Sequence, residues 1–420
     1  REGELTVKQR DKLLASMTEE VGRLVLRDNY FQTQVLSLMG RLAPELLDAQ
    51  ARFMRYLEKE GRLVRALEFL PDDEVLHERR AAGIGLAAPE RAVLLAYAKI
   101  WLDDALVASD LPDDPWVATA LNRYFPKVLQ EKFGLWMTQH PLRREIIANY
   151  VTNSALNRVG ATFVHRTCET TGAEPHEVVR AYLLTREVFG IVDMWTDIEA
   201  LDNLVPDDVQ AHLLINIAQL VDRATIWFLR SPRLTDDMQT TISAFAPQIA
   251  SLEGLFNDLL DPADVERLEA EVERIAASGV PPALARRVIS LEPLFAGLDM
   301  FEVSDAPIKT VARIFFSLAR RLGLPWLREQ IAALPGAQHW QMLARGAMMD
   351  DLSGLQRTLT VQVLQGSPDP DDTEAVIDEW AANHQRALDR ATRLITELRG
   401  ASMVNEAMLS VAIRELRNLG

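Results

Sequence analysis

One pattern recurs along this chain: a short segment rich in proline, aspartate or glycine, followed by an apolar pattern with the period of a helix. Proline is tolerated in the first helical turn because its missing N–H would have no partner there, so each such segment predicts a helix start. Convincing alternating patterns are absent, and the β-branched segment 161–165 (ATFVH) is short. The sequence predicts an all-α fold, a multi-helix bundle array with no substantial sheet. The prolines that fit this position are Pro44, Pro89, Pro115, Pro141, Pro175, Pro206, Pro262 and Pro325.

The apolar runs between these breaks predict individual helices. Ser16 and Glu19 have the spacing of a capping box, which predicts a helix start ahead of the run that ends at Gly40. Alanine, leucine, arginine and glutamate dominate the runs and favour helix. The other predicted helices cover residues 44–61, 89–110, 140–160, 207–231, 262–279, 310–323, 338–365 and 373–400, with a last one from Ser402.

Two hydrophilic breaks predict subdomain boundaries. The segment 231–237 (SPRLTDD) follows an aromatic helix end, and the segment 366–372 (GSPDPDD) precedes the last helices. We predict a first helical subdomain over 1–231 and a second over 232–420. No fixed-period repeat emerges, so a helical solenoid is not supported.

Composition and charge exclude several classes of protein. Of the 420 residues 48% are hydrophobic and 25% charged, and the net charge is −16. Such a surface repels nucleic acid, and no apolar run is long enough to span a membrane. Cys168 is the one cysteine, so an intramolecular disulfide is impossible. Residue 1 is Arg and no signal-peptide pattern follows it. We expect a cytoplasmic protein, and a chain cut or processed from a longer one.

Residues 83–88 match the glycine spacing of a dinucleotide-binding turn. Gly83, Gly85 and Ala88 fit G-x-G-x-x-G/A, and Asp103 lies where a ribose-binding acid would be sought. That turn must leave a buried strand, whereas residues 72–80 are nearly all charged. We favour a different interpretation, in which the glycines close one helix and Pro89 opens the next.

Three further patterns have both a functional and a structural interpretation. The segment from His176 to Arg180 (HEVVR) begins like a zinc-protease signature but lacks the second imidazole. Lys99 lies in an apolar helix, where it is either a base of lowered pKa or a core-edge lysine whose ammonium reaches Asp103. The stripe Asn149, Asn153 and Asn157 either fixes helix register or lines a polar pocket; we favour the structural interpretation of each.

Aromatic residues at apolar helical positions predict core packing: Trp227, Phe228, Trp326, Trp340 and Trp380. No nucleophile elbow, phosphate-binding loop or paired metal-binding carboxylate motif appears. Taken alone, the residues predict a helical protein with no catalytic, cofactor-binding or metal-binding residues of its own.

Several stretches resemble the large bacterial NAD-specific glutamate dehydrogenases. They include LVLRDNYFQTQVLSL at 24–38, FPKVLQEKFG at 125–134, LRREIIANYVTNSALNRVGATFVHR at 142–166 and HWQMLARGAMMDDLSGLQRTLT at 339–360. The resemblance covers nearly the whole chain. It is to the helical C-terminal region of those enzymes, which begins just after the catalytic part.

The resemblance implies a parent enzyme that oxidises L-glutamate to 2-oxoglutarate and ammonia with NAD. The catalytic lysine and aspartate of the family and its NAD turn belong to upstream sequence, and Lys99 does not match their context. The expected partners are that upstream catalytic domain and further copies of the parent in a homo-oligomer, with no nucleic acid and no membrane. Two alternatives stay open: a helical protein-interaction module, and a self-sufficient enzyme that uses Lys99 or the asparagine stripe.

Overall fold

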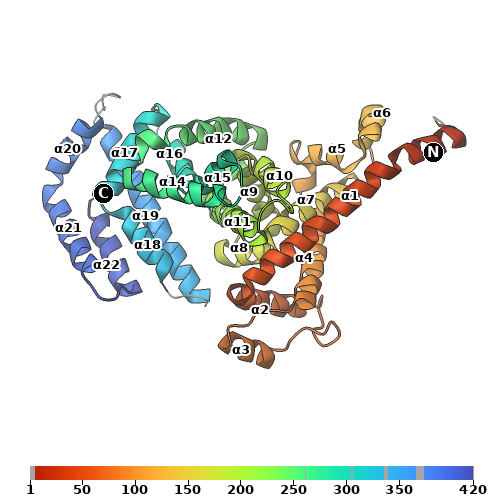
Figure 1. Cartoon of the computed structure of the whole chain (residues 1–420), viewed down its shortest axis with the longest axis horizontal. Coiled ribbons are helices and arrows are strands. Elements are labelled where there is room, and N and C mark those ends of the chain that lie inside the picture. The colour runs from red at the N-terminus through yellow and green to blue at the C-terminus, as the bar shows by residue number, and fades with distance from the viewer. Residues whose placement is uncertain (1–4, 261, 304–305, 335–338, 366–372, 420) are drawn as a thin grey trace. The chain divides into compact units, whose positions relative to one another are not determined.

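The chain folds into helices joined by turns and loops (Figure 1). The computed structural model describes residues 5–260, 262–303, 306–334, 339–365 and 373–419, and none of these residues lies in a β-strand. The all-α prediction is confirmed. The longest helices, α1 (Val7–Arg41) and α19 (His339–Gln365), lie near opposite ends of the sequence.

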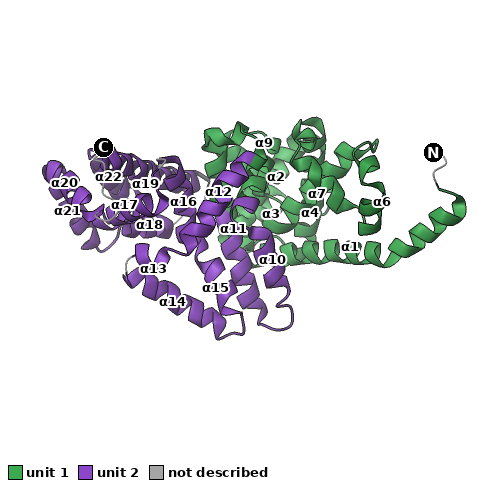
Figure 2. Ribbon diagram, turned by 90° about the horizontal axis from the view of Figure 1, so that it is seen from above, with its two compact units in different colours: residues 1–185, 221–239 green, residues 186–220, 240–420 purple. Residues whose placement is uncertain are grey.

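The chain divides into two compact units, coloured separately in Figure 2. The first comprises residues 1–185 and 221–239, and the second comprises residues 186–220 and 240–420. Helices α9 (Pro175–Val188) and α11 (Asp207–Arg230) are divided between them. The subdomain boundary expected between residues 231 and 232 stays a prediction, and the break expected at 366–372 lies outside the described residues.

The first unit is built around α7 (Arg143–Val159), which packs against α1, α4 (Ala88–Ala108) and α5 (Ala120–Tyr124). Leu94 and Leu102 of α4 and Leu156 of α7 are fully buried. Each such leucine contributes about 1.5–3 kcal/mol through removal of its side chain from water. The remaining elements are α2 (Ala43–Lys59), α3 (Asp73–Ala81), η1 (Leu111–Asp113), η2 (Val117–Thr119), α6 (Lys127–Met137), α8 (Phe163–Thr171) and η3 (Pro232–Thr235).

The second unit is built around α17 (Ile308–Arg321), which packs against α16 (Leu291–Val303), α18 (Leu324–Ala333), α19 and α20 (Thr373–Asn383). Its core includes the buried side chains of Leu318, Leu352 and Ile377. The other helices are α10 (Ile191–Glu199), α12 (Met238–Glu253), α13 (Phe256–Leu259), α14 (Pro262–Ala276), α15 (Pro282–Ile289), α21 (Gln385–Arg399) and α22 (Glu406–Arg417).

Helix α1 begins earlier than the sequence predicts. Its N-cap is Thr6, which forms a capping box with Gln9. Ser16 lies inside the helix and donates its hydroxyl to the Leu13 carbonyl, so the capping box expected at Ser16 and Glu19 is wrong. The reason is local: the earlier box satisfies the N–H groups of Thr6 and Gln9, and the residues that follow it favour helix.

The helix expected over 373–400 is interrupted at His384. This residue leaves helical geometry (φ −111°, ψ 14°), and α20 and α21 lie on either side of it. Its imidazole stacks on Trp380, with ring centroids 4.9 Å apart, and its Nδ1 lies 2.8 Å from the Trp380 carbonyl oxygen. The helix thus breaks where the His384 side chain contacts the preceding turn. The apolar pattern of residues 373–400 does not indicate this break.

The aromatic predictions have mixed outcomes. Phe228 and Trp380 are buried, as expected, and Trp326 packs partly buried against the core of the second unit. Trp227 is half-buried and meets Phe228 edge-on. Trp340 is 79% exposed, so its assignment to the core is wrong. It lies in the first turn of α19, whereas the buried residues described in that helix begin at Met348.

Candidate functional site

The glycine-rich segment 83–88 connects two helices. Gly83 follows the C-terminal end of α3 with φ +66°, and the Ile84 N–H bonds back to the Arg79 carbonyl at 2.8 Å. A Cβ on Gly85 would lie 2.3 Å from the Ala43 backbone, so this glycine permits a close approach of two chain segments. Pro89 lies in the first turn of α4. The prediction that the glycines close one helix and Pro89 opens the next is confirmed.

The N-terminus of α4 is already occupied by a carboxylate. Glu90 accepts the Ala87 N–H at 2.7 Å and two bonds from the Arg79 guanidinium at 2.6 and 2.9 Å. Burial alone would raise the pKa of Glu90, but the bonds from Arg79 and Ala87 outweigh it and hold that pKa below its usual value. A dinucleotide phosphate here would meet the partly buried Glu90 carboxylate, which repels it. Glu90 is thus a cap that the glycine spacing alone does not reveal.

Lys99 lies on α4 and is half-buried. The pairing of its ammonium with Asp103, which the sequence analysis expected, does not occur. Burial lowers the pKa of its ammonium to about 8, and the Asp28 carboxylate of α1 opposes that shift. Asp103 is itself desolvated and lies near Asp104 and Glu145, so its pKa is raised. One Asp103 carboxylate oxygen is buried without a hydrogen bond in the described part of the chain. The carboxylate that opposes the pKa shift of Lys99 therefore belongs to another helix.

The asparagine stripe on α7 runs from the surface into the core. Asn149 is exposed, Asn153 donates to the Asn149 carbonyl oxygen at 3.1 Å and to its side-chain oxygen at 3.2 Å, and Asn157 is buried. The Asn157 side-chain oxygen has no partner among the described residues. The first two amides bond to each other along the helix, which supports the structural interpretation for them.

Arg180 is a structural clamp in the first unit. Its guanidinium donates to the Leu234 carbonyl at 2.8 Å, to the Asp236 carbonyl at 2.8 Å and to the Asp114 carboxylate at 2.7 Å. It therefore ties α9 to two loops that are distant in sequence. His176 begins the same helix, and no group of histidine, cysteine or acidic residues suited to a metal ion occurs within the described ranges.

Cys168 is a free thiol on α8, half-buried. Burial raises its pKa to about 12, and the nearby Glu174 and Glu177 carboxylates act in the same direction. The thiolate is the nucleophilic form of cysteine. This side chain is accordingly a poor nucleophile and a poor metal ligand at neutral pH.

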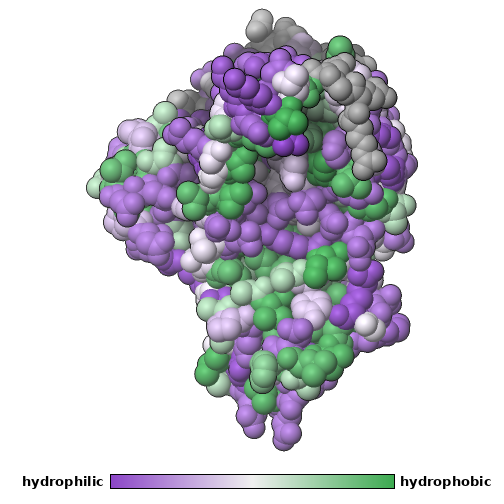
Figure 3. All heavy atoms as spheres, turned by 90° about the vertical axis from the view of Figure 1, so that its right-hand side faces the viewer, coloured by the Kyte–Doolittle hydropathy of each residue, from purple (hydrophilic) through white to green (hydrophobic). Residues whose placement is uncertain are grey.

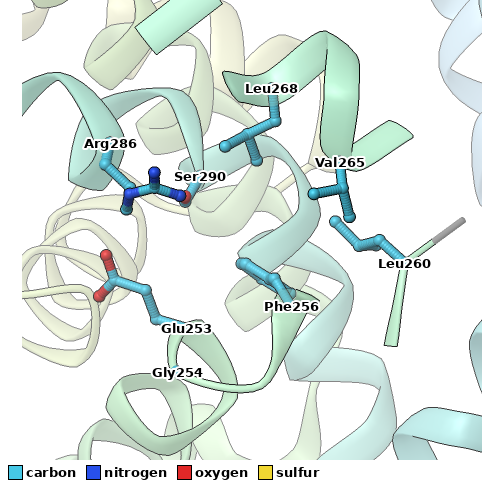
Figure 4. A pocket seen from close by; sticks show the side chains of 8 residues that line it. All are labelled: Glu253, Gly254, Phe256, Leu260, Val265, Leu268, Arg286 and Ser290. Carbon is cyan, nitrogen blue, oxygen red and sulfur yellow. The ribbon is translucent and has the colours of Figure 1, made fainter. Parts of the chain in front are cut away.

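Sequence analysis missed a small cavity in the second unit, of about 200 Å³ (Figure 4). The Arg286 guanidinium and the Glu253 carboxylate lie on one side of it, and the apolar side chains of Val265 and Leu268 on the other. Arg286 also donates two hydrogen bonds to the Glu269 carboxylate, of which the one from Nη1 is 2.5 Å long. Ligand sites usually enclose about 300–1,000 Å³, so this cavity suits only a small molecule or waters.

Another hollow, of about 430 Å³, lies at the turn between α20 and α21, where His384 and Arg390 contribute to its lining. Neither hollow contains any of the residues that the sequence singled out as candidates for chemistry.

None of the helices described in the structure combines the length and the low polarity needed to cross a membrane.

Two protein-family models match the chain in succession. Residues 1–39 match the bacterial NAD-glutamate dehydrogenase catalytic domain, and residues 83–418 match the glutamate dehydrogenase C-terminal model. The catalytic-domain model thus includes most of α1, whereas the sequence analysis placed the whole chain after the catalytic part.

Curated relatives named NAD-specific glutamate dehydrogenase match over 420 residues and 99% of the chain. Identity is 42% with the protein of Pseudomonas aeruginosa, 38% with that of Halomonas elongata and 33% with that of Mycobacterium tuberculosis. The chain spans 26% of the length of each. These matches and the all-helical fold show that the chain belongs to the NAD-specific glutamate dehydrogenase family. It corresponds to the C-terminal part of those proteins.

Proposed function

We propose that this chain is the non-catalytic helical region of an NAD-dependent glutamate dehydrogenase, and that it supports the catalytic domain from outside the active site. The observation that carries the proposal is the order of the two family matches, a match to the catalytic-domain model followed by a match to the C-terminal model. The parent enzyme would convert L-glutamate, NAD and water to 2-oxoglutarate, ammonia and NADH.

The described residues favour a supporting role over chemistry. The candidate nucleotide turn is a helix connection capped by Glu90, Arg180 is a clamp, and Cys168 is held protonated. We assign no catalytic, cofactor-binding or metal-binding residue to this chain, and NAD to the parent enzyme. We place the parent in the cytoplasm.

The helical region would act through contacts with the catalytic domain or with other subunits of a homo-oligomer. Closure of two-domain enzymes often gates turnover. If the helical region binds the closed catalytic domain more tightly than the open one, or the reverse, it shifts the equilibrium between the two states. The size of the shift is set by the difference between the two affinities. The region would thereby contribute to structure, assembly or regulation.

Deletion of residues 42–420 from the full-length enzyme tests this role. The specific activity, the oligomer mass and the response to amino-acid effectors are measured, with the exposed substitution Trp340→Ala as a control that leaves the region in place. We expect the deletion to change at least one of the three and the control to change none. The proposal fails if the deletion leaves all three unchanged.

An interaction module with no bearing on dehydrogenase turnover is the alternative. It predicts that the deletion leaves activity, oligomer mass and effector response unchanged, and that the catalytic portion does not capture this chain in a pulldown.

A self-sufficient enzyme predicts NADH formation from glutamate and NAD by this chain. We expect no such activity, and no NAD binding tighter than about 1 mM, because the helix N-terminus at residues 87–90 already holds a carboxylate.

A further inference from the structure

The first half of α1 carries an exposed apolar stripe. Val7, Leu14, Val21 and Val25 are 66%, 54%, 44% and 54% exposed. Their spacings of seven and four residues place them on one face of the helix. From Val7 to Val25 the stripe is about 27 Å long at 1.5 Å per residue. We call these four residues the α1 stripe.

The rest of α1 is firmly anchored within the first unit. Val35 and Met39 are buried, and the Arg158 guanidinium of α7 lies 4.1 Å from the centre of the Phe31 ring. In the middle of the helix, the Glu20 carboxylate accepts the Lys127 N–H at 3.1 Å, at the start of α6. The stripe therefore lies on a helix whose position in this unit is set by packing and by hydrogen bonds.

More apolar surface lies nearby. Leu135 and Trp136 of α6 are 86% and 50% exposed. Figures 1 and 2 both place α6 beside the first half of α1, and Figure 3 shows green apolar side chains among hydrophilic ones on the side of the molecule where these helices lie. Apolar groups ringed by polar ones are typical of protein–protein contacts.

The family matches favour the catalytic domain as the occupant of this surface. Residues 1–39, which include the whole stripe, match the catalytic-domain model, while the chain spans 26% of its relatives. An amphipathic helix of a domain buries its apolar face against other elements of that domain. The second half of α1 buries its apolar face on the helical region. The stripe is still exposed and is therefore the part of α1 that can pack on the catalytic body.

We propose that the α1 stripe docks on the body of the catalytic domain, so that one continuous helix joins that domain to the helical C-terminal region. This inference rests on the proposed function and assigns it a surface. Because α1 is anchored at its other half, movement of the catalytic body would be transmitted to α7 and α4, on which α1 packs.

The test uses the full-length dehydrogenase with Val21→Asp and Val25→Asp combined. The control is Leu26→Asp, which introduces one carboxylate, against two in the test variant, at a position 70% exposed and one residue round the helix from Val25. Hydrogen exchange is measured over residues 7–28 and over the catalytic body, together with oligomer mass. Residues 29–41 report whether α1 itself remains folded.

We expect exchange over residues 7–28 and in the contacting part of the catalytic body to rise about tenfold or more in the double variant, since each buried valine contributes about that factor to docking. The control should change it less than about twofold. If residues 29–41 also lose protection, the milder Val25→Ser replaces the double variant and must reproduce the difference from Leu26→Asp.

Two outcomes overturn the inference. One is equal exchange in the stripe variant and the control. The other is a changed oligomer mass with unaltered exchange in the catalytic body, which would make the stripe a contact between two copies of the enzyme. Either result leaves the proposed function intact if deletion of residues 42–420 still alters activity, mass or effector response.

Discussion

Arg180 offers the sharpest test of how the first unit is held together. The substitution Arg180→Met keeps most of the apolar stem and removes the guanidinium, which donates to two carbonyls and to Asp114. The side chains of Arg180 and Asp114 are 19% and 13% exposed, so these bonds are only partly open to water.

The magnitude follows from the contacts that are lost. A hydrogen bond to a charged group contributes about 1.5–3 kcal/mol, so three independent bonds set an upper limit of about 4.5–9 kcal/mol. Asp114 remains bonded to the Trp116 and Val117 N–H groups at 2.9 and 3.1 Å. The two carbonyls lie in a loop that can relax toward water. We therefore expect a loss of about 2–4 kcal/mol in the free energy of unfolding, near the cost of breaking a buried ion pair.

Urea unfolding of this chain, followed by circular dichroism and by hydrogen exchange of the loop 232–237, measures the effect. The control is Arg233→Met in the same loop. Arg233 is 54% exposed and pairs with Asp236 at 3.4 Å, so its loss should cost less than about 0.5 kcal/mol. If Arg180→Met costs no more than the control, the three bonds do not stabilise the unit and the reasoning is refuted.

Other substitutions test burial and charge. Trp380→Ala should lower the free energy of unfolding by about 3–5 kcal/mol. Trp340→Ala should change it by less than about 0.5 kcal/mol. Equal effects of the two substitutions in urea denaturation would contradict the burial assigned to these tryptophans. Lys99 has a folded pKa of about 8 against 10.5 for the free side chain, so between these pH values the unfolded state binds more protons and stability rises with pH. Lys99→Met should remove that part of the slope in unfolding measured from pH 7 to 10, and an unchanged slope would argue against a desolvated ammonium. Cys168, whose pKa is raised to about 12, should resist a disulfide reagent at pH 8 until the chain is unfolded, and rapid labelling of the folded chain would contradict its burial.

Local signals made most of the fold predictable. Pro44 and Pro89 lie in the first turns of α2 and α4, and Gly61 and Gly83 adopt positive φ after helix ends. A cap or a glycine acts on backbone groups within a few residues, so its effect is readable from sequence alone. The two failures have local causes as well: Thr6 and Gln9 form the capping box ahead of Ser16, and the His384 side chain contacts the preceding turn.

The long-range contacts of the candidate residues belong to the tertiary structure. The hydrogen bonds of Arg180 reach residues 54, 56 and 66 positions away, and the cavity beside Arg286 is assembled from several helices. The carboxylate that opposes the pKa shift of Lys99 is Asp28, which lies on another helix. The sequence by itself determined an all-helical chain of the glutamate dehydrogenase family, because helical period and residue identity are properties of the chain. Only the tertiary structure decided which side chains are buried, paired or left exposed on α1, because those depend on which helices pack together.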